Sequence, residues 1–217
     1  MKLNTLDSII DDILLELRNH NISESEQISR IQIEQWIVQY RSILIKQDID
    51  KGRDINPNYE QTIYDVNLEL VENISYNTLI FHRLKSDIKI PKAIDLHYKS
   101  GITSVLDLHG NEIQLMSEKR SNMQKYRRYT DSDYTAYMKD DYLYLNGPMI
   151  IEKVEINGIF ENPSEVPGFD YTGVYPIPAN MLPTLKELIF AKELKITLPT
   201  DNKNNSNNDL ENINAKQ

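Results

Sequence analysis

The chain has 217 residues, with 24 Lys and Arg against 33 Asp and Glu, a net charge of -9, 40% hydrophobic residues, no cysteine and 7 glycines. This length is enough for one domain, or two small ones, with a hydrophobic core. The absence of cysteine excludes disulfide scaffolds, Cys-ligated metal sites and thiol chemistry. The acidic balance argues against a protein whose main task is to hold nucleic acid, because phosphate binding relies on Lys and Arg.

Two amphipathic helices are predicted in the first fifty residues. Apolar residues between Leu6 and Leu17 recur at helical spacing opposite an acidic face, with Thr5 or Asn4 as the cap. Ser29 and Gln32 form a capping-box pattern before a second apolar stripe that ends near Gly52. The two segments predict a helical hairpin.

From about Tyr59 the hydrophobic period changes to two, which predicts strands. In the clearest strand, four residues are expected to face inward: Tyr64, Val66, Leu68 and Leu70. Further strands are predicted at residues 88–90, at 106–108 paired with 113–115, and at 142–145. Asn146-Gly147 is predicted to be the turn of a hairpin leading to residues 149–151, because both residues tolerate positive φ.

A Pro- and Gly-rich linker from Asn162 to Pro178 precedes a last predicted helix, with Asn180 as its cap and Pro183 in its first turn. Four residues give this helix an apolar side: Leu182, Leu185, Ile189 and Ile196. After Pro199 the chain is rich in Asn and poor in apolar residues, so it is expected to become ordered only against partners.

The sequence contains no recognisable catalytic, cofactor or metal motif. The four histidines lie in separate segments without ligand spacing, and no glycine pattern forms a phosphate-binding loop. No Ser lies in a nucleophile elbow, and the adjacent acids Asp11-Asp12 and Asp140-Asp141 are interpreted as solvated faces. The expectation is therefore no cofactor, no metal and no enzyme, with a carboxylate-based hydrolase as the only chemistry left open.

No membrane segment is predicted. The longest uncharged run, Tyr171 to Leu185, contains three prolines and is shorter than the ~20 apolar residues that a spanning helix needs. The N-terminus lacks the features of a secretory signal, so synthesis in the cytoplasm is expected.

A basic patch lies between Met116 and Thr130, where Tyr126 and Tyr129 alternate with cations. The cations are Lys119, Arg120, Lys125, Arg127 and Arg128. Such a patch would either clamp a phosphate backbone and stack bases, or pair with acidic faces of a neighbouring subunit.

Three stretches, taken in order, carry a resemblance to a known family. Residues 32–47 include Trp36, Tyr40 and Arg41; residues 157–163 read Asn-Gly-Ile-Phe-Glu-Asn-Pro; and Tyr175-Pro-Ile-Pro178 runs into residues 181–189. Together they resemble the head-to-tail connector (adaptor, or ring) proteins of short-tailed bacteriophages, most closely the ring proteins of crAss-like phages.

The resemblance implies an α+β fold, in which helices from both chain ends form a bundle with an inserted, mostly antiparallel β-rich region. The corresponding division is residues 1–55 for the helical hairpin and 56–177 for the β-rich region. Residues 178–199 would form the helix that packs on the hairpin, and 200–217 a polar tail ordered by partners.

The resemblance also implies a virion protein without catalytic residues, assembled as a closed ring of twelve copies. Its expected partners are the portal, other tail ring proteins and genomic DNA that passes through the lumen without specific binding. The candidate subunit-interface residues are Trp36, Tyr40, Arg41, Lys119, Arg120, Lys125, Arg127, Arg128, Asn202 and Asn208.

The leading hypothesis is therefore a ring-forming connector of the head-to-tail or upper-tail region. In such a ring the charge of -9 per copy would repel DNA and let it slide, provided that the acids line the channel. The alternative is a soluble nucleic-acid-binding module that uses the basic patch at residues 119–128.

Overall fold

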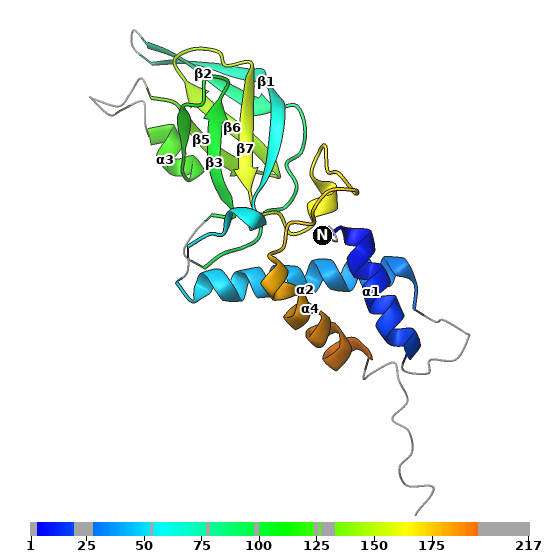
Figure 1. The fold of residues 1–217 in the computed structure, drawn as a ribbon. Coiled ribbons are helices and arrows are strands. Elements are labelled where there is room, and N and C mark those ends of the chain that lie inside the picture. Colours follow the sequence, from blue (N-terminus) through cyan, green and yellow to red (C-terminus); the bar gives the residue numbers. More distant parts are fainter. Residues whose placement is uncertain are drawn as a thin grey trace, which may run out of the picture.

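The computed structural model describes residues 4–19, 28–52, 54–76, 79–97, 100–123, 126 and 133–194. Its largest unit is a β-barrel, which lies above a layer of helices in Figure 1. The chain enters the barrel after the second helix and leaves it before the last, so the barrel and the helices are joined by two connections.

Seven strands close into the barrel in the order β1-β2-β6-β5-β4-β3-β7. Their bounds are β1 Gln61–Tyr76, β2 Leu79–Ser86, β3 Ile102–Asp107, β4 Glu112–Leu115, β5 Thr135–Lys139, β6 Tyr142–Gly147 and β7 Lys153–Gly158. Neighbouring strands are antiparallel except β4 and β5, which pair in parallel through Gln114↔Thr135 and Leu115↔Ala136. Alternate residues point inward and fill the barrel with aliphatic side chains. Among them are Ile63, Val66, Leu84, Val105, Leu143, Leu145, Val154 and Ile156.

The described helices are α1 (Leu6–Asn19), α2 (Arg30–Asp50), α3 (Glu118–Met123) and α4 (Leu182–Ile189), with a π-helical turn at Phe190–Leu194 after α4. α1, α2 and α4 share one hydrophobic cluster, and α3 lies on the side of the barrel. α2 is buried on two sides, because Ile37 packs in the helical cluster while Ile45 and Ile49 pack against Tyr59 and Ile159 under the barrel. α2 therefore packs against the other helices on one side and against the base of the barrel on the other.

The predicted fold class is wrong. A bundle of helices with an inserted β region was expected, but the strands form a closed seven-stranded barrel accompanied by only a few helices. Closure depends on pairs between distant segments, such as Gln61↔Gly158 of β1 and β7. Closing the sheet pairs the backbone N–H and C=O groups that the edge strands of an open sheet would leave unpaired.

The predicted turn at Asn146-Gly147 is also wrong. Both residues lie within β6, where Gly147 pairs with His82 of β2 and Asn146 pairs with both Arg83 and Thr135. Gly147 is required by packing, because a Cβ at this position would lie 2.1 Å from the Tyr134 ring. β6 and β7 are not neighbours in the barrel.

The alternation predicted along β1 holds for only part of the strand. Val66 and Leu68 are buried, whereas Tyr64 is 67% and Leu70 46% exposed. Asp65 adopts φ 54 at an irregularity between Ile63 and Val66, and a second irregularity follows Leu70. Each bulge inserts one residue into β1, so after it the residues that face the barrel interior change from even to odd positions or back.

Several local predictions are confirmed. The Ser8 amide is capped by Thr5 Oγ1 at 3.2 Å, the Gln32 amide by Ser29 Oγ at 3.2 Å, and α2 ends before Gly52 at φ 80. The β3–β4 hairpin forms with Val105 opposite Ile113.

Two further local predictions fail. Residues 88–90 are not a strand; the strand in this part of the chain is β2. Asn180 does not cap α4, because it lies in a 3-10 turn, Ala179–Met181, that runs directly into the helix.

Candidate functional site

Arg41 on α2 joins the helices to the barrel. Its Nη1 donates to the Phe160 carbonyl oxygen at 2.8 Å, just after β7, and its Nη2 to the Tyr59 carbonyl at 3.4 Å, just before β1. Its Nε donates to the Pro176 carbonyl at 2.8 Å in the linker that leads to α4. One side chain therefore holds both barrel connections and the approach to the last helix.

The Arg41 guanidinium is completely buried, and burial lowers its pKa to about 10. Among the described residues no carboxylate pairs with it; carbonyl oxygens and the face of the Tyr175 ring, 5.8 Å away, surround the charge. A buried cation with a rigid fork of donors fixes the geometry of the groups that it binds. This arrangement keeps helices and barrel in one fixed orientation.

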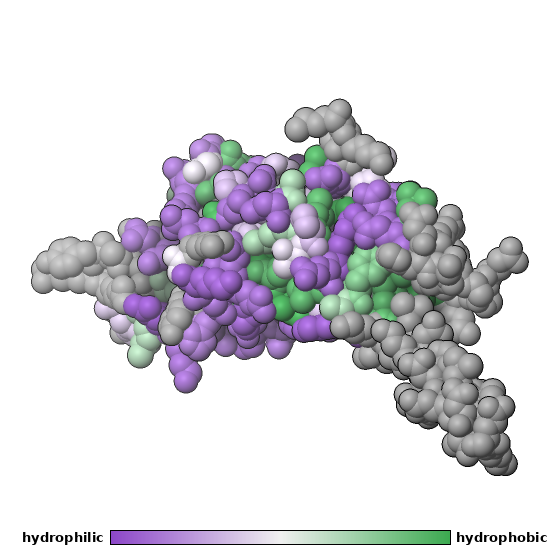
Figure 2. Space-filling model, turned by 60° about the horizontal axis from the view of Figure 1, so that its bottom comes forward, coloured by the Kyte–Doolittle hydropathy of each residue, from purple (hydrophilic) through white to green (hydrophobic). Residues whose placement is uncertain are grey.

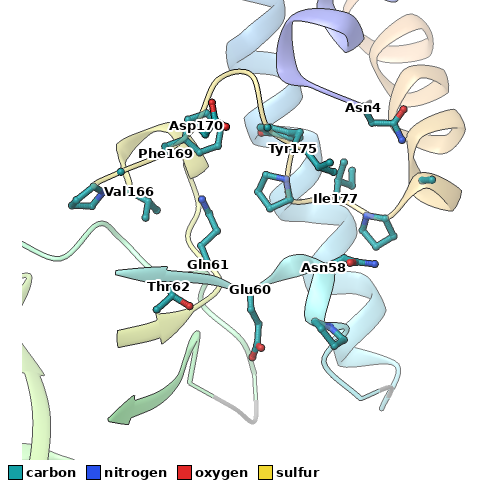
Figure 3. Close-up of a pocket in the computed structure, with 18 residues that line it drawn as sticks. Asn4, Asn58, Glu60, Gln61, Thr62, Val166, Phe169, Asp170, Tyr175 and Ile177 are labelled. Carbon is teal, nitrogen blue, oxygen red and sulfur yellow. The ribbon is translucent and has the colours of Figure 1, made fainter. Parts of the chain in front are cut away.

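A groove of about 560 Å³ opens beside this joint, between the start of β1 and the linker segment, residues 162–178. Figure 3 shows Gln61 pointing from β1 toward the linker residues Val166, Phe169 and Asp170, with Asn4 on the helical side. Gln61 Nε2 donates to the Pro163 carbonyl at 3.2 Å, and its Oε1 is buried without a partner in the described part of the chain. Gln61 therefore fastens the start of β1 to the linker segment at the edge of the groove.

Two carboxylates, Asp170 and Glu60, line the groove. The Asp170 carboxylate accepts bonds from the Thr172 hydroxyl and amide at 2.7 and 2.9 Å, and these bonds lower its pKa. Over the described ranges, no three His, Asp or Glu side chains come close enough together to hold a metal ion.

The predicted interface residues Trp36 and Tyr40 lie in the helical core together with Ile37. The Tyr40 hydroxyl donates to Glu193 Oε1 in the π-helical turn, and burial, followed by this bond, raises the pKa of Tyr40 to about 12. These contacts, like those of Arg41, lie within one chain. A role for the three residues at a subunit interface stays a prediction.

Lys119 and Arg120 of the predicted basic patch are exposed on α3. α3 is attached to the barrel through Ser121 Oγ, which lies 2.7 Å from Thr135 Oγ1 and accepts from Asn146 Nδ2 at 2.8 Å. Five other candidates lie outside the described residues: Lys125, Arg127, Arg128, Asn202 and Asn208. The candidates that the structure does describe occupy two separate places, the helical core and the barrel side (Figure 1).

The face of the molecule formed by the helices carries both apolar and hydrophilic residues. Figure 2 shows apolar residues gathered in the middle of this face and hydrophilic residues around them. Partly buried apolar side chains here include Leu14, Ile43, Leu182, Leu188 and Phe190. Acidic residues of α1 pair across the helices: Asp7 with Arg30 at 2.9 Å and Glu16 with Lys186 at 3.2 Å. These pairs are exposed, so they orient the helices more than they stabilise them.

Sequence reasoning missed Tyr59, Gln61 and Phe160 as parts of the joint and groove. Arg41 meets Phe160 across 119 residues and Pro176 across 135 residues of the chain. The available signal was the position of Arg41 itself, a cation at helical spacing between the apolar residues Ile37 and Ile45.

The family model for phage tail ring protein 2 matches residues 8–210 of this chain. The chain belongs to this crAss-like phage tail ring protein family. The match spans the helices, the Arg41 joint and the whole barrel, so it applies to the entire architecture. No curated protein matches the chain significantly.

Membership makes the chain a structural ring protein of the phage tail, and thus of the virion. None of the helices in the described part of this ring protein has the length and apolar character needed to cross a membrane.

Proposed function

We propose that this ring protein is a connector of the head-to-tail or upper-tail region, through whose lumen the phage genome passes. The family match across residues 8–210 carries the proposal. The Arg41 joint supports it, because a ring closes only if each copy holds its two contact faces at a constant angle. The protein is made in the cytoplasm of the host and acts in the particle.

Twelve copies form the ring, with the portal and other tail ring proteins as neighbours. Each contact is heterologous, so one face of a copy meets a different face of the next. The exposed Lys119 and Arg120 on α3 provide a basic face, and exposed acids elsewhere on the chain provide an acidic one. Residues 200–217, beyond the described part of the chain, become ordered against neighbouring subunits.

Electron microscopy of the purified protein and of phage particles tests the proposal. Closed rings with twelvefold symmetry, and the same density next to the portal in particles, are the expected result. A protein that stays monomeric at every concentration and is missing from particles contradicts the proposal.

A charge-reversal variant tests the contact face on α3. Lys119→Glu/Arg120→Glu should weaken ring assembly, and 0.5 M salt should weaken wild-type assembly in the same direction, since screening acts on exposed charges. Lys51→Glu, an exposed cation after α2, is the matched control and should assemble normally. Sedimentation velocity measures the ring fraction in each case.

A further inference from the structure

The charges of the barrel are divided between two opposite walls. The strands β1, β3, β4 and β7 together carry six carboxylates and one lysine, a net charge of -5. The strands β2, β5 and β6 together with α3 carry five Lys or Arg and one Glu, a net charge of +4. In the closed strand order, β3 and β7 lie across the barrel from β6. We call the first group of elements the acidic wall and the second the basic wall.

Two carboxylates of the acidic wall lie in one row across three strands. Leu106 of β3 pairs with Glu112 of β4 on one side and with Glu155 of β7 on the other. Neighbouring strands are about 4.8 Å apart, so the two carboxylates are about 10 Å apart with Leu106 between them. Glu112 is exposed, and Leu106 and Glu155 are half-buried, while alternate residues of these strands fill the barrel. The row is therefore an outward surface of two carboxylates around one apolar side chain.

These two carboxylates have no cationic partner within the described part of the chain. No described Lys or Arg forms an ion pair with Glu112 or Glu155. The acids of α1 differ, because Asp7 and Asp11 both pair with Arg30. The row on the acidic wall therefore keeps negative charge that a cationic surface of another molecule can neutralise.

The basic wall carries a cation over a layer of tyrosine rings. Lys85 Nζ lies 3.6 Å from the centroid of the Tyr142 ring. The rings of Tyr137 and Tyr144 are stacked, with centroids 5.3 Å apart and planes 9° apart. Lys85 pairs with Tyr144 across β2 and β6, and Tyr144 pairs with Tyr137 across β6 and β5. This wall therefore also has a row in register, with a cation at one end.

α3 adds two further cations to the basic wall. Arg83 Nη2 of β2 donates to Asn122 Oδ1 of α3 at 2.9 Å, which fixes the helix on this side of the barrel. Arg83 also pairs with Glu72 of β1 at 3.0 Å, where the two walls meet. Lys119 and Arg120 are exposed, and among the described residues neither has a carboxylate partner. The positive charge of α3 is thus left for another molecule.

A second copy of the chain fits the basic wall better than DNA does. Proteins that hold single strands stack bases on aromatic faces. Here Lys85 covers one face of Tyr142, and Tyr137 covers one face of Tyr144. Phosphate binding also relies on many Lys and Arg, whereas the chain as a whole carries a net charge of -9. The acidic wall of another copy supplies carboxylates without requiring free rings.

We propose that, in the assembled ring, the acidic wall of one copy packs against the basic wall of the next copy. This inference rests on the proposed ring-forming function. The walls are different surfaces on opposite sides of one barrel, so the contact is heterologous and repeats around the ring. Glu112 and Glu155 face the cations of the neighbour, which are Lys85, Lys119 and Arg120. Each wall supplies the charge that the other lacks, which fixes the partner and the register.

Two charge-reversal variants test the contact. The acid-reversed variant carries Glu112→Lys/Glu155→Lys, and the base-reversed variant carries Lys85→Glu/Lys119→Glu/Arg120→Glu. Each variant alone places like charges across every contact, so the concentration needed for half-assembly should rise at least about 10-fold in sedimentation velocity. Circular dichroism and thermal unfolding check that the variants fold. Glu112→Gln/Glu155→Gln removes charge without reversing it, should weaken assembly in the same direction, and replaces the acid-reversed variant if that variant does not fold.

Mixing the two variants distinguishes this contact from general electrostatic damage. In an equimolar mixture, alternating copies place opposite charges across every contact, so rings should form again. Native mass spectrometry should find the two variants in equal numbers in these rings. Asp50→Lys/Glu187→Lys is the matched control, because it makes the same change of charge at exposed positions on α2 and α4. This control should assemble as wild type does and should not restore assembly of the base-reversed variant.

The outcomes separate the inference from the function. Folded variants that assemble like wild type, or a mixture that stays unassembled, overturn the inference and leave the ring function standing. Duplex DNA that binds wild type but not the base-reversed variant, with assembly unchanged, also overturns it and assigns the basic wall to DNA. Wild-type protein that never forms rings overturns the proposed function itself.

Discussion

At the scale of single residues, Arg41 is the side chain whose loss should cost the most stability. Arg41→Met would leave the carbonyl oxygens of Phe160 and Pro176 buried without donors. We expect the free energy of unfolding to fall by about 3 kcal/mol. The free energy of unfolding of Arg41→Lys should lie between those of Arg41→Met and wild type, because an ammonium group cannot reproduce the planar fork of the guanidinium.

Urea unfolding followed by circular dichroism measures the effect of each variant. Arg120→Met removes an exposed arginine on α3 and serves as the control, with a change within about 0.5 kcal/mol. Wild-type stability in Arg41→Met would show that the joint does not depend on this residue.

Removing the Tyr175 hydroxyl should, in contrast, stabilise the chain. Its hydroxyl is buried and has no hydrogen-bond partner among the described groups, and burial raises its pKa from 10.0 to about 12. Tyr175→Phe removes a desolvated polar atom without breaking a bond, so the free energy of unfolding at pH 7 should rise by about 1 kcal/mol. Tyr171→Phe changes an exposed ring and should have no effect.

The same residue predicts a pH dependence. Because the pKa of Tyr175 is higher in the folded chain than in the unfolded one, the unfolded chain loses its proton first as pH rises above 10. The contribution of Tyr175 to the free energy of unfolding should therefore fall between pH 10 and 12, while Arg41, whose pKa is lowered to about 10 by burial, contributes a rise in the same range. In Tyr175→Phe the free energy of unfolding should fall less steeply with pH, and Tyr40 accounts for part of the fall that remains. Equal slopes in urea titrations at pH 9.5 and 11 would contradict this assignment.

At the scale of elements, the β5–β6 turn stores strain that a substitution can relieve. Asp140 and Asp141 connect the two strands with φ 52 and 65, which is a type I′ turn built from residues with a Cβ. Asp140→Asn/Asp141→Gly should raise the free energy of unfolding by about 0.5–1 kcal/mol. The Asp141 carbonyl, which accepts from the Ile90 amide at 2.7 Å, is kept.

Thermal unfolding checks this prediction, with Asp133→Gly as the control. Asp133 precedes β5 and is not among the described residues with positive φ, so glycine there should not stabilise the chain. A lower melting temperature for the turn variant would argue that the two carboxylates contribute more than the strain costs.

At the scale of the whole molecule, the net charge of -9 predicts how the assembly treats DNA. A connector ring should show no salt-sensitive affinity for duplex DNA, because its acidic surfaces repel phosphate. Fluorescence anisotropy with a labelled duplex between 50 and 200 mM salt measures this. Tight binding that weakens steeply with salt and is lost in Arg127→Glu/Arg128→Glu would favour the nucleic-acid-binding module instead.

Much of the local structure follows from residues that are near one another in the chain. The apolar spacing of α1, the Ser29 cap and the β3–β4 turn, with Gly110 at φ 80, were all predictable. Their interactions span three or four residues in helices and caps, or one tight turn, so short sequence windows contain them. The family resemblance rested on equally local motifs, and the match over residues 8–210 confirms it.

The architecture was decided by contacts between residues that lie far apart in the sequence. Asn146-Gly147 has the composition of a turn, but pairing with β2 and β5 places it inside a strand, and Tyr134 accounts for the glycine. Barrel closure joins Gln61 to Gly158, and Arg41 binds carbonyls 119 and 135 residues away. The sequence by itself therefore determined part of the local structure, including α1, the Ser29 cap and the β3–β4 hairpin, and the family. Only the tertiary structure decided the closed barrel and the joint, because long-range pairing and burial override local preference.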